Sequence, residues 1–271
     1  MTHALVLLLL LQAPSADDRA RDVVKRMTFP DEAAVRKWTD QGTEYVTLLN
    51  VLLKREHWVD AVKYVEEKLG PIGDTWAIEV ALQEWNGTTV ALGDRIGERC
   101  QVRFNMRKLG DYERKMEGFR KQDEELRKKG KRLSWKVPPI RYDRIVHHEL
   151  THILQGEVKT PGWFHEGLAS WIGNDMNYVI AFGYAKKPVQ TIEVDLSADP
   201  DDEYGRGMMF FKWLEGRNGQ AGVKKLFKAA YADGVDWKKA LEEATGLKWA
   251  GVIEAEREWS ERYGKSHAPR E

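Results

Sequence analysis

Cysteine is almost absent from this 271-residue chain, because Cys100 is the only one. A single cysteine excludes an intramolecular disulfide and a zinc site built from several cysteines. We predict that Cys100 is a structural residue of a strand. A net charge is also absent, since 43 Lys and Arg residues balance 43 Asp and Glu residues. The chain therefore lacks the basic excess that is typical of nucleic-acid-binding proteins, and we expect no nucleic-acid partner.

Long hydrophobic runs are missing as well. The apolar run from Ala4 to Leu11 is too short for the roughly 20 residues of a transmembrane helix, but it suits the core of a signal peptide. Small residues then offer a cleavage site near Ser15 or Ala16. No Lys or Arg precedes the run, and a buried helix start is the alternative interpretation. We predict a signal peptide over residues 1–16, a secreted or periplasmic protein, and no stable membrane insertion once that peptide is removed.

Histidine is concentrated in one stretch, with four of the seven histidines between positions 147 and 165. His148, Glu149 and His152 form the pattern H-E-x-x-H. On an α-helix, residues i and i+4 lie on one face about one turn apart, so the two imidazoles can bind one metal ion. Glu149 lies about 100° round the helix, where it can act as a general base beside the metal.

The residues around this pattern favour a helix with one side in the core. Val146, Leu150, Ile153 and Leu154 cluster on the arc opposite the two ligand histidines. His147 falls well over a quarter-turn from the ligand face, so we interpret it as a neighbour and not as a ligand. A core helix with incidental histidines is the alternative.

A catalytic zinc site usually has three protein ligands, so one more is needed. The metzincin pattern H-E-x-x-H-x-x-G-x-x-H is excluded, because Gln155 and Val158 stand where it requires Gly and His. His165 and Glu166 are the remaining candidates. They are adjacent on a predicted second helix, and spacing does not choose between them.

The motifs together resemble the gluzincin zinc metallopeptidases, a group distantly similar to thermolysin that includes small MA-like peptidases with the signature H-E-x-x-H…W-x-x-E-G-x-A. The resemblance runs roughly from Asp143 to Leu214. Its residues are His148-Glu149-Leu150-Thr151-His152, Trp163-x-x-Glu166-Gly167-x-Ala169, and Tyr204-Gly205-Arg206-Gly207-x-x-Phe210-Phe211-x-Trp213-Leu214.

The resemblance implies one zinc ion held by His148, His152 and Glu166. Thermolysin-like relatives carry an aspartate four residues after the glutamate, as a partner that orients a ligand, and this chain has Ser170 there. The orienting group is therefore not predicted by the resemblance.

The resemblance also implies a peptidase that acts on a peptide or protein substrate, with Glu149 as the general base. Relatives use a tyrosine or a histidine to stabilise the oxyanion, so Tyr204 is our first candidate for this donor and His165 our second. A packed aromatic residue is the alternative role for Tyr204. The chain lacks the G-x-M-E-N-type motif of the clan's aminopeptidases, which favours an endopeptidase.

Two other functions fit the same residues. One is a zinc hydrolase that acts on a cell-wall peptide or another non-protein amide. The other is a catalytically silent scaffold that keeps zinc for stability. The presence of Glu149 argues against the scaffold, because a structural site has no use for a base.

The predicted fold is α+β: a zincin-like catalytic domain with a small sheet followed by metal-binding helices, plus an N-terminal helical segment. We place the signal peptide at 1–16, the helical segment at 17–72, the catalytic domain at 73–263 and a polar tail, with His267, at 264–271. Periodicity and turn residues predict strands at 76–82, 88–92 and 100–104 and helices that start at Pro30–Glu32 and span 108–132, about 140–154, 203–214, 237–244 and 249–263.

Two further expectations concern the sheet. Asn86-Gly87 predicts a hairpin between the first two strands. By analogy with gluzincins, an edge strand at Cys100–Met106 or Leu133–Val137 would hold an extended peptide by β-addition, although a plain structural sheet explains the sequence equally well. Residues Tyr178–Tyr184 are predicted to form a strand or loop that borders the cleft.

Overall fold

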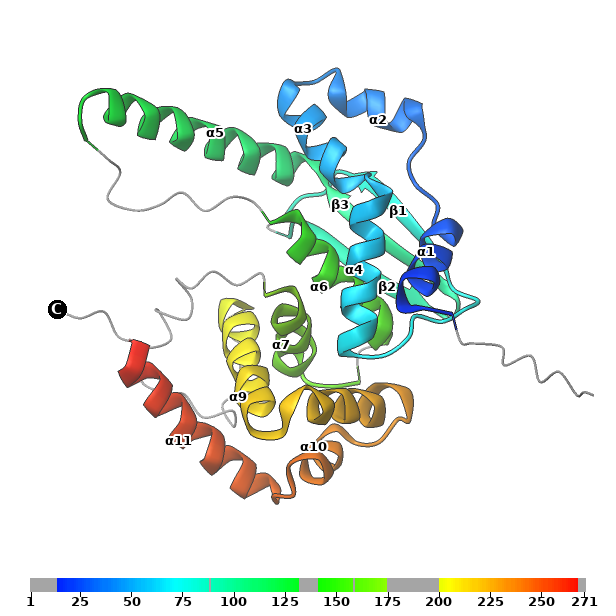
Figure 1. The fold of residues 1–271 in the computed structure, drawn as a ribbon, viewed down its shortest axis with the longest axis vertical. Helices are drawn as coiled ribbons and strands as arrows, with labels where there is room; N and C mark the ends of the chain where they lie inside the picture. Colours follow the sequence, from blue (N-terminus) through cyan, green and yellow to red (C-terminus); the bar gives the residue numbers. More distant parts are fainter. Residues whose placement is uncertain (1–13, 88, 132–140, 158, 175–199, 268–271) are drawn as a thin grey trace, which may run out of the picture.

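The fold is α+β, mostly helical with one small mixed sheet (Figure 1). The computed structural model describes residues 14–87, 89–131, 141–157, 159–174 and 200–267, and only the backbone of 200–203 and 264–267. The predicted signal-peptide core and the predictions for Leu133–Val137 and Tyr178–Tyr184 lie outside these residues. None of the described helices has both the length and the apolar character that crossing a bilayer requires.

The elements alternate between helical blocks and the sheet. In chain order they are α1 (Ala16–Arg26), α2 (Glu32–Thr39), α3 (Thr43–Leu52), α4 (Arg55–Lys68), β1 (Ala77–Gln83), β2 (Ala91–Ile96), β3 (Arg99–Asn105), α5 (Met106–Lys128), α6 (Tyr142–Gln155), α7 (Gly162–Gly173), α9 (Pro200–Phe227), η2 (Lys228–Ala232), α10 (Trp237–Thr245) and α11 (Trp249–His267).

The N-terminal helices form where the periodicity predicts them. Asp31 caps α2 by accepting a hydrogen bond from the Ala34 N–H at 2.8 Å, which confirms the predicted start of this helix. The helices share one core with the sheet and α6. Thr28 joins them to β1, because its N–H donates to the Ile78 carbonyl and its own carbonyl accepts from the Val80 N–H.

The strand order is β1-β3-β2, with β1 parallel to β3 and β2 antiparallel to it. The Asn86-Gly87 hairpin prediction is therefore wrong, because β1 pairs with β3 and not with β2. The hairpin joins β2 to β3 instead, and its turn contains Gly97 at φ 63°, a conformation that favours glycine. The predicted edge strand at Cys100–Met106 is wrong for the same reason, since β3 is the central strand and has a partner on each side.

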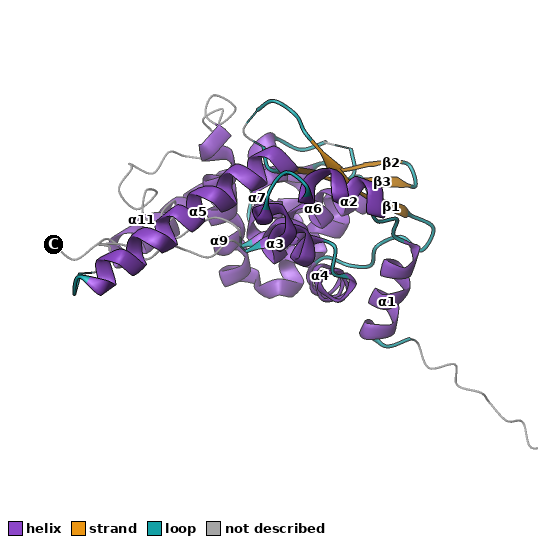
Figure 2. Ribbon diagram, turned by 90° about the horizontal axis from the view of Figure 1, so that it is seen from above, coloured by secondary structure: helices purple, strands orange, loops and turns teal. Residues whose placement is uncertain are grey.

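One face of the sheet belongs to the core. Alternate residues of β3, namely Cys100, Val102 and Phe104, are buried. Cys100 is therefore in a strand, as predicted. The helices gather on one side of the strands (Figure 2). The edge strand β2 packs against α6, so the sheet lies directly beside the helix that carries the H-E-x-x-H pattern.

The C-terminal half is a helical layer built on α9, which kinks at Gly219 (φ 66°). The helices predicted at 237–244 and 249–263 are present as α10 and α11, and α11 extends to His267, beyond the predicted start of the polar tail at 264. Arg206 of α9 and Glu256 of α11 form a buried ion pair with two contacts between guanidinium and carboxylate. In Figure 1, α6 and α7 lie between this layer and the N-terminal half.

Candidate metal centre

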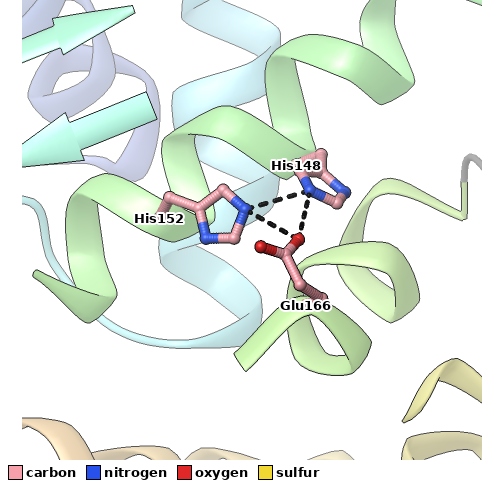
Figure 3. A group of neighbouring side chains, drawn as sticks. All are labelled: His148, His152 and Glu166. Atoms are coloured by element: carbon pink, nitrogen blue, oxygen red, sulfur yellow. Dashed lines mark hydrogen bonds and ion pairs between the residues drawn. The ribbon is translucent and has the colours of Figure 1, made fainter. Parts of the chain in front are cut away.

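Three side chains from α6 and α7 converge on one point (Figure 3). His148 and His152 are one turn apart on α6, and their Nε2 atoms are 3.0 Å apart. The Oε2 atom of Glu166, on α7, lies 3.4 Å from His148 Nε2 and 3.3 Å from His152 Nε2. Each of the three residues thus directs one potential ligand atom at the same space.

The spacing of these atoms fits a small tetrahedral ion. Zinc bonds of roughly 2.0–2.1 Å at tetrahedral angles separate neighbouring ligand atoms by about 3.3–3.4 Å. The separations from Glu166 Oε2 have this length, and the separation between the two imidazoles is slightly shorter. Two imidazole nitrogens and a carboxylate oxygen are also a ligand set that zinc prefers. The residues present therefore fit a zinc ion.

The remaining faces of α6 are in the positions that the periodicity predicts. Val146, Leu150, Ile153 and Leu154 are buried. His147 points to the N-terminal half, where its ring stacks on Tyr64 with ring centroids 4.4 Å apart. Burial lowers the pKa of His147 to about 4, so this imidazole is neutral at pH 7. It does not belong to the group formed by His148, His152 and Glu166, in agreement with its interpretation as a neighbour.

Glu149 is buried beside the cluster, at 6% exposure. Burial raises the pKa of its carboxyl above the usual range, against the opposing effect of His148, His152 and a hydrogen bond from the Gly93 backbone. Gly93 belongs to β2 and touches the backbone of Glu149, because a Cβ at position 93 would lie 2.2 Å from the Glu149 carbonyl oxygen. Only glycine lets the edge strand approach this part of α6 so closely.

The pKa of Glu166 is shifted in the opposite direction to that of Glu149. Burial alone would raise its pKa, but hydrogen bonds and charge interactions with the protonated forms of His148 and His152 outweigh burial and hold the pKa of this carboxyl well below its usual range. The helix that carries it is placed by a second close backbone contact. Gly167 of α7 packs on Gly207 of α9, where a Cβ at position 207 would lie 2.0 Å from the Trp163 carbonyl oxygen.

His165 lies on the other edge of His152. Its Nε2 is 3.1 Å from His152 Nδ1, whereas Glu166 faces His152 Nε2. Burial, followed by the effect of His152, lowers the pKa of His165 to about 3. Of the two candidates that spacing left open for the third ligand, the structure brings Glu166, and not His165, to both imidazole Nε2 atoms.

Tyr204 and Ser170 were also singled out by the sequence. The Tyr204 ring lies nearly parallel to that of His148, at an interplanar angle of 20° and a centroid distance of 6.0 Å. This position beside a candidate metal ligand keeps Tyr204 a candidate for the oxyanion donor. Ser170 is fully buried, and its hydroxyl has no hydrogen-bond partner among the described residues. In the described part of the chain, Ser170 therefore does not take over the orienting role of the aspartate.

Gln155 is a site residue that the sequence analysis missed. Its Oε1 lies 2.7 Å from His152 Nδ1, and its Nε2 donates to the His165 carbonyl at 2.8 Å and to the Tyr231 hydroxyl at 3.1 Å. In the sequence, Gln155 is noticeable only because it stands where the metzincin pattern requires a glycine. Its position three residues after His152, on the same face of the helix, is the signal that would have identified it.

Comparison of the chain with protein-family models, curated proteins and solved structures gives no match. The resemblance to gluzincins therefore rests on the motifs of α6, α7 and α9 and on the arrangement that these helices give to the motif residues.

Proposed function

We propose that the protein is a zinc-dependent peptidase, of gluzincin type and zincin-like fold, that uses Glu149 as its general base. The observation that carries this proposal is the set of separations, from 3.0 to 3.4 Å, among His148 Nε2, His152 Nε2 and Glu166 Oε2. Such a set, with a buried carboxylate next to it, matches what a metal-assisted hydrolase needs.

Each residue has a distinct part in the proposed reaction. His148, His152 and Glu166 hold the ion. When bound, zinc supplies Lewis acidity that brings the pKa of water towards about 7 and polarises a carbonyl. The Glu149 carboxylate takes the proton from the attacking water and then delivers it to the departing amine nitrogen. Tyr204 is the first candidate to donate a hydrogen bond to the oxyanion, and His165 is the second.

The edge strand β2 supports a peptide as the substrate. Asn105 of β3 donates to the Val90 carbonyl, so the alternation of an antiparallel ladder turns the backbone groups of Ala91, Gly93 and Arg95 away from β3. At Gly93 this edge reaches Glu149. An extended peptide paired with β2 would therefore run past the proposed base. Binding by β-addition is thus proposed for β2 in place of β3.

The proposal includes export. The apolar run at Ala4–Leu11 and the small residues up to Ala16 support a cleaved signal peptide and a secreted or periplasmic enzyme. N-terminal sequencing of protein recovered from the producing cells should give a start near Ser15 or Ala16. A start at Met1 in exported protein would contradict this part of the proposal.

The test is hydrolysis by the purified protein before and after metal exchange. Casein, short peptides and peptidoglycan fragments are offered to protein treated with a chelator and to the same protein reloaded with zinc. We expect cleavage of casein or peptides that disappears with the metal and returns with it. Cleavage of peptidoglycan fragments alone would favour the cell-wall hydrolase. A chelator that only lowers the melting temperature would refute the enzyme and favour the scaffold.

A further inference from the structure

A chain of hydrogen bonds lies behind His152, on the side away from Glu166. It runs from His152 Nδ1 to Gln155 and on to Tyr231, whose hydroxyl is 3.0 Å from Thr160 Oγ1. The four residues come from three segments, namely α6, the connection between α6 and α7, and η2. His152, Gln155 and Thr160 are buried, at 8% exposure or less.

The direction of this chain follows from what each group can donate. The His165 backbone carbonyl only accepts hydrogen bonds, so the Gln155 atom 2.8 Å from it must be the amide nitrogen. The amide oxygen of Gln155 then faces His152 Nδ1 at 2.7 Å, and this oxygen also only accepts. The hydrogen of the neutral His152 imidazole must therefore be on Nδ1. Nε2 keeps its lone pair, and this is the atom that faces His148 and Glu166.

His165 is consistent with the same arrangement. Its Nε2 is 3.1 Å from His152 Nδ1, farther than the Gln155 oxygen. With a hydrogen on Nδ1 of His152, Nε2 of a neutral His165 has to be its unprotonated nitrogen. Gln155 thus determines the hydrogen positions of both rings, because the tautomer of an imidazole is set by the hydrogen bond that its second nitrogen makes.

The far end of the chain is anchored by Tyr231. This residue belongs to η2, a π-helical turn, and π-helical turns often occur at functional sites. The Tyr231 hydroxyl accepts from Gln155 Nε2, so its own hydrogen is available for Thr160 Oγ1. The ring is held separately by Phe227, with centroids 5.2 Å apart. Removal of the hydroxyl alone should therefore leave the packing of η2 intact.

We propose that Gln155 is a positioning residue of the metal site, which fixes the Nδ1–H tautomer of His152, and that Tyr231 fixes the orientation of Gln155. This inference rests on the proposed function insofar as His152 is a metal ligand. It assigns to a neutral glutamine the orienting task that a carboxylate performs in other zinc sites.

The experiment measures two quantities on Gln155→Met, Tyr231→Phe and the unchanged protein. The first is the His152 tautomer in metal-free protein at pH 8, from the ¹⁵N shifts of its two ring nitrogens. The second is zinc affinity, from competition with a chromophoric chelator. Gln155→Met should lose the single Nδ1–H pattern and bind zinc about 10- to 100-fold more weakly. Tyr231→Phe should weaken zinc binding roughly fivefold, the value of one hydrogen bond.

Two control variants separate positioning from general damage. Thr245→Val removes a buried hydrogen bond to the Leu241 carbonyl in α10, and it should lower stability without changing zinc affinity. His165→Phe keeps a ring against His152, and it should change zinc affinity by less than about twofold, because Gln155 still holds the hydrogen on Nδ1.

The outcomes distinguish the two proposals. If Gln155→Met keeps both the wild-type tautomer pattern and the wild-type zinc affinity, Gln155 does not position His152. If the variant fails to fold, the ¹⁵N pattern of the unchanged protein decides, since a hydrogen on His152 Nε2 overturns the inference. If the unchanged protein shows the Nδ1–H pattern but binds no zinc, the proposed function fails while the tautomer assignment stands.

Discussion

The buried Glu149 and the partly buried Glu166 lie beside the same pair of imidazoles, and their pKa values move in opposite directions. For Glu149, burial dominates and raises the pKa. For Glu166, the contacts with His148 and His152 overcome burial and lower it. Two carboxyls whose surroundings separate their pKa values in this way are suited to different tasks. The difference agrees with the proposed roles, which are proton transfer for Glu149 and ion binding for Glu166.

Each glutamate is also placed by a contact that only glycine permits. Gly93 lets β2 touch the backbone of Glu149, and Gly207 lets α9 touch α7 next to Glu166. The two carboxyls therefore depend on different neighbours, the sheet for the base and the C-terminal layer for the ligand. This separation allows either task to be disturbed alone.

The strongest test of the comparison is Glu149→Gln. The amide keeps the shape of the side chain but cannot accept a proton, so peptide hydrolysis should fall about 10²- to 10⁴-fold. Zinc content, measured by elemental analysis, should stay at the wild-type stoichiometry. Wild-type turnover by a zinc-loaded variant would show that Glu149 is not the base.

The matching change at the other carboxyl is Glu166→Gln. Loss of a ligand should weaken zinc binding by more than the roughly 100-fold that is typical of losing an orienting partner. Chelator competition gives the affinity, and His165→Phe is the control on the adjacent residue. If His165→Phe loses the metal and Glu166→Gln keeps it, the two residues have been assigned the wrong way round.

The glycine contacts predict smaller and separable effects. Gly207→Ala forces α7 and α9 apart, and it should cost about 1–3 kcal/mol of unfolding free energy and weaken zinc binding. Gly93→Ala should reduce turnover more than zinc affinity, because β2 touches Glu149. Urea unfolding, chelator competition and a peptide-hydrolysis assay measure both variants. Gly216→Ala is the control in α9, where a Cβ meets nothing within 4 Å and stability should not fall.

The last effect concerns His147, lies outside the comparison of the two carboxyls and depends on pH. Burial lowers its pKa from 6.5 to about 4, so between these values the unfolded chain binds a proton that the folded protein does not. The free energy of unfolding should therefore fall as the pH drops from about 6.5 to about 4, by up to about 3 kcal/mol for this residue. His147→Phe, which keeps a ring against Tyr64, should reduce that slope in urea titrations. An unchanged slope would show that His147 contributes nothing to it.

The sequence predicted those parts of the site that depend on local periodicity. The facing positions of His148 and His152 and the buried arc of α6 follow from helical geometry alone. The sheet topology did not follow, because Asn86-Gly87 is a stronger turn signal than Gly97-Glu98, although the chain turns sharply at the second. Spacing also left His165 and Glu166 equivalent, and only the packing of α7 on α9 decides which of them faces the two imidazoles.

Contacts between distant segments were beyond the sequence. Tyr231 is separated from Gln155 by 76 positions, and it reaches Gln155 from a π-helical turn that no periodicity identified. The sequence predicted β3 as an edge strand, although β3 is central. An alternating strand pattern indicates which face is buried and not the order of the strands. The sequence shows that Ser170 stands where thermolysin-like relatives have an orienting carboxylate. That Gln155 lies next to His152 Nδ1, where it can take this role, is visible only in the three-dimensional structure.

The ion pair between Arg206 and Glu256 bears on how far the chain can be shortened. Both side chains are almost completely buried, at 3% and 1% exposure. A truncation before Glu256 would leave the Arg206 guanidinium in the interior without this carboxylate, at a cost of roughly 3–5 kcal/mol. Arg206 lies two residues after Tyr204, whose ring is beside that of His148, so trimming the C-terminus would act on the candidate metal centre from a distance.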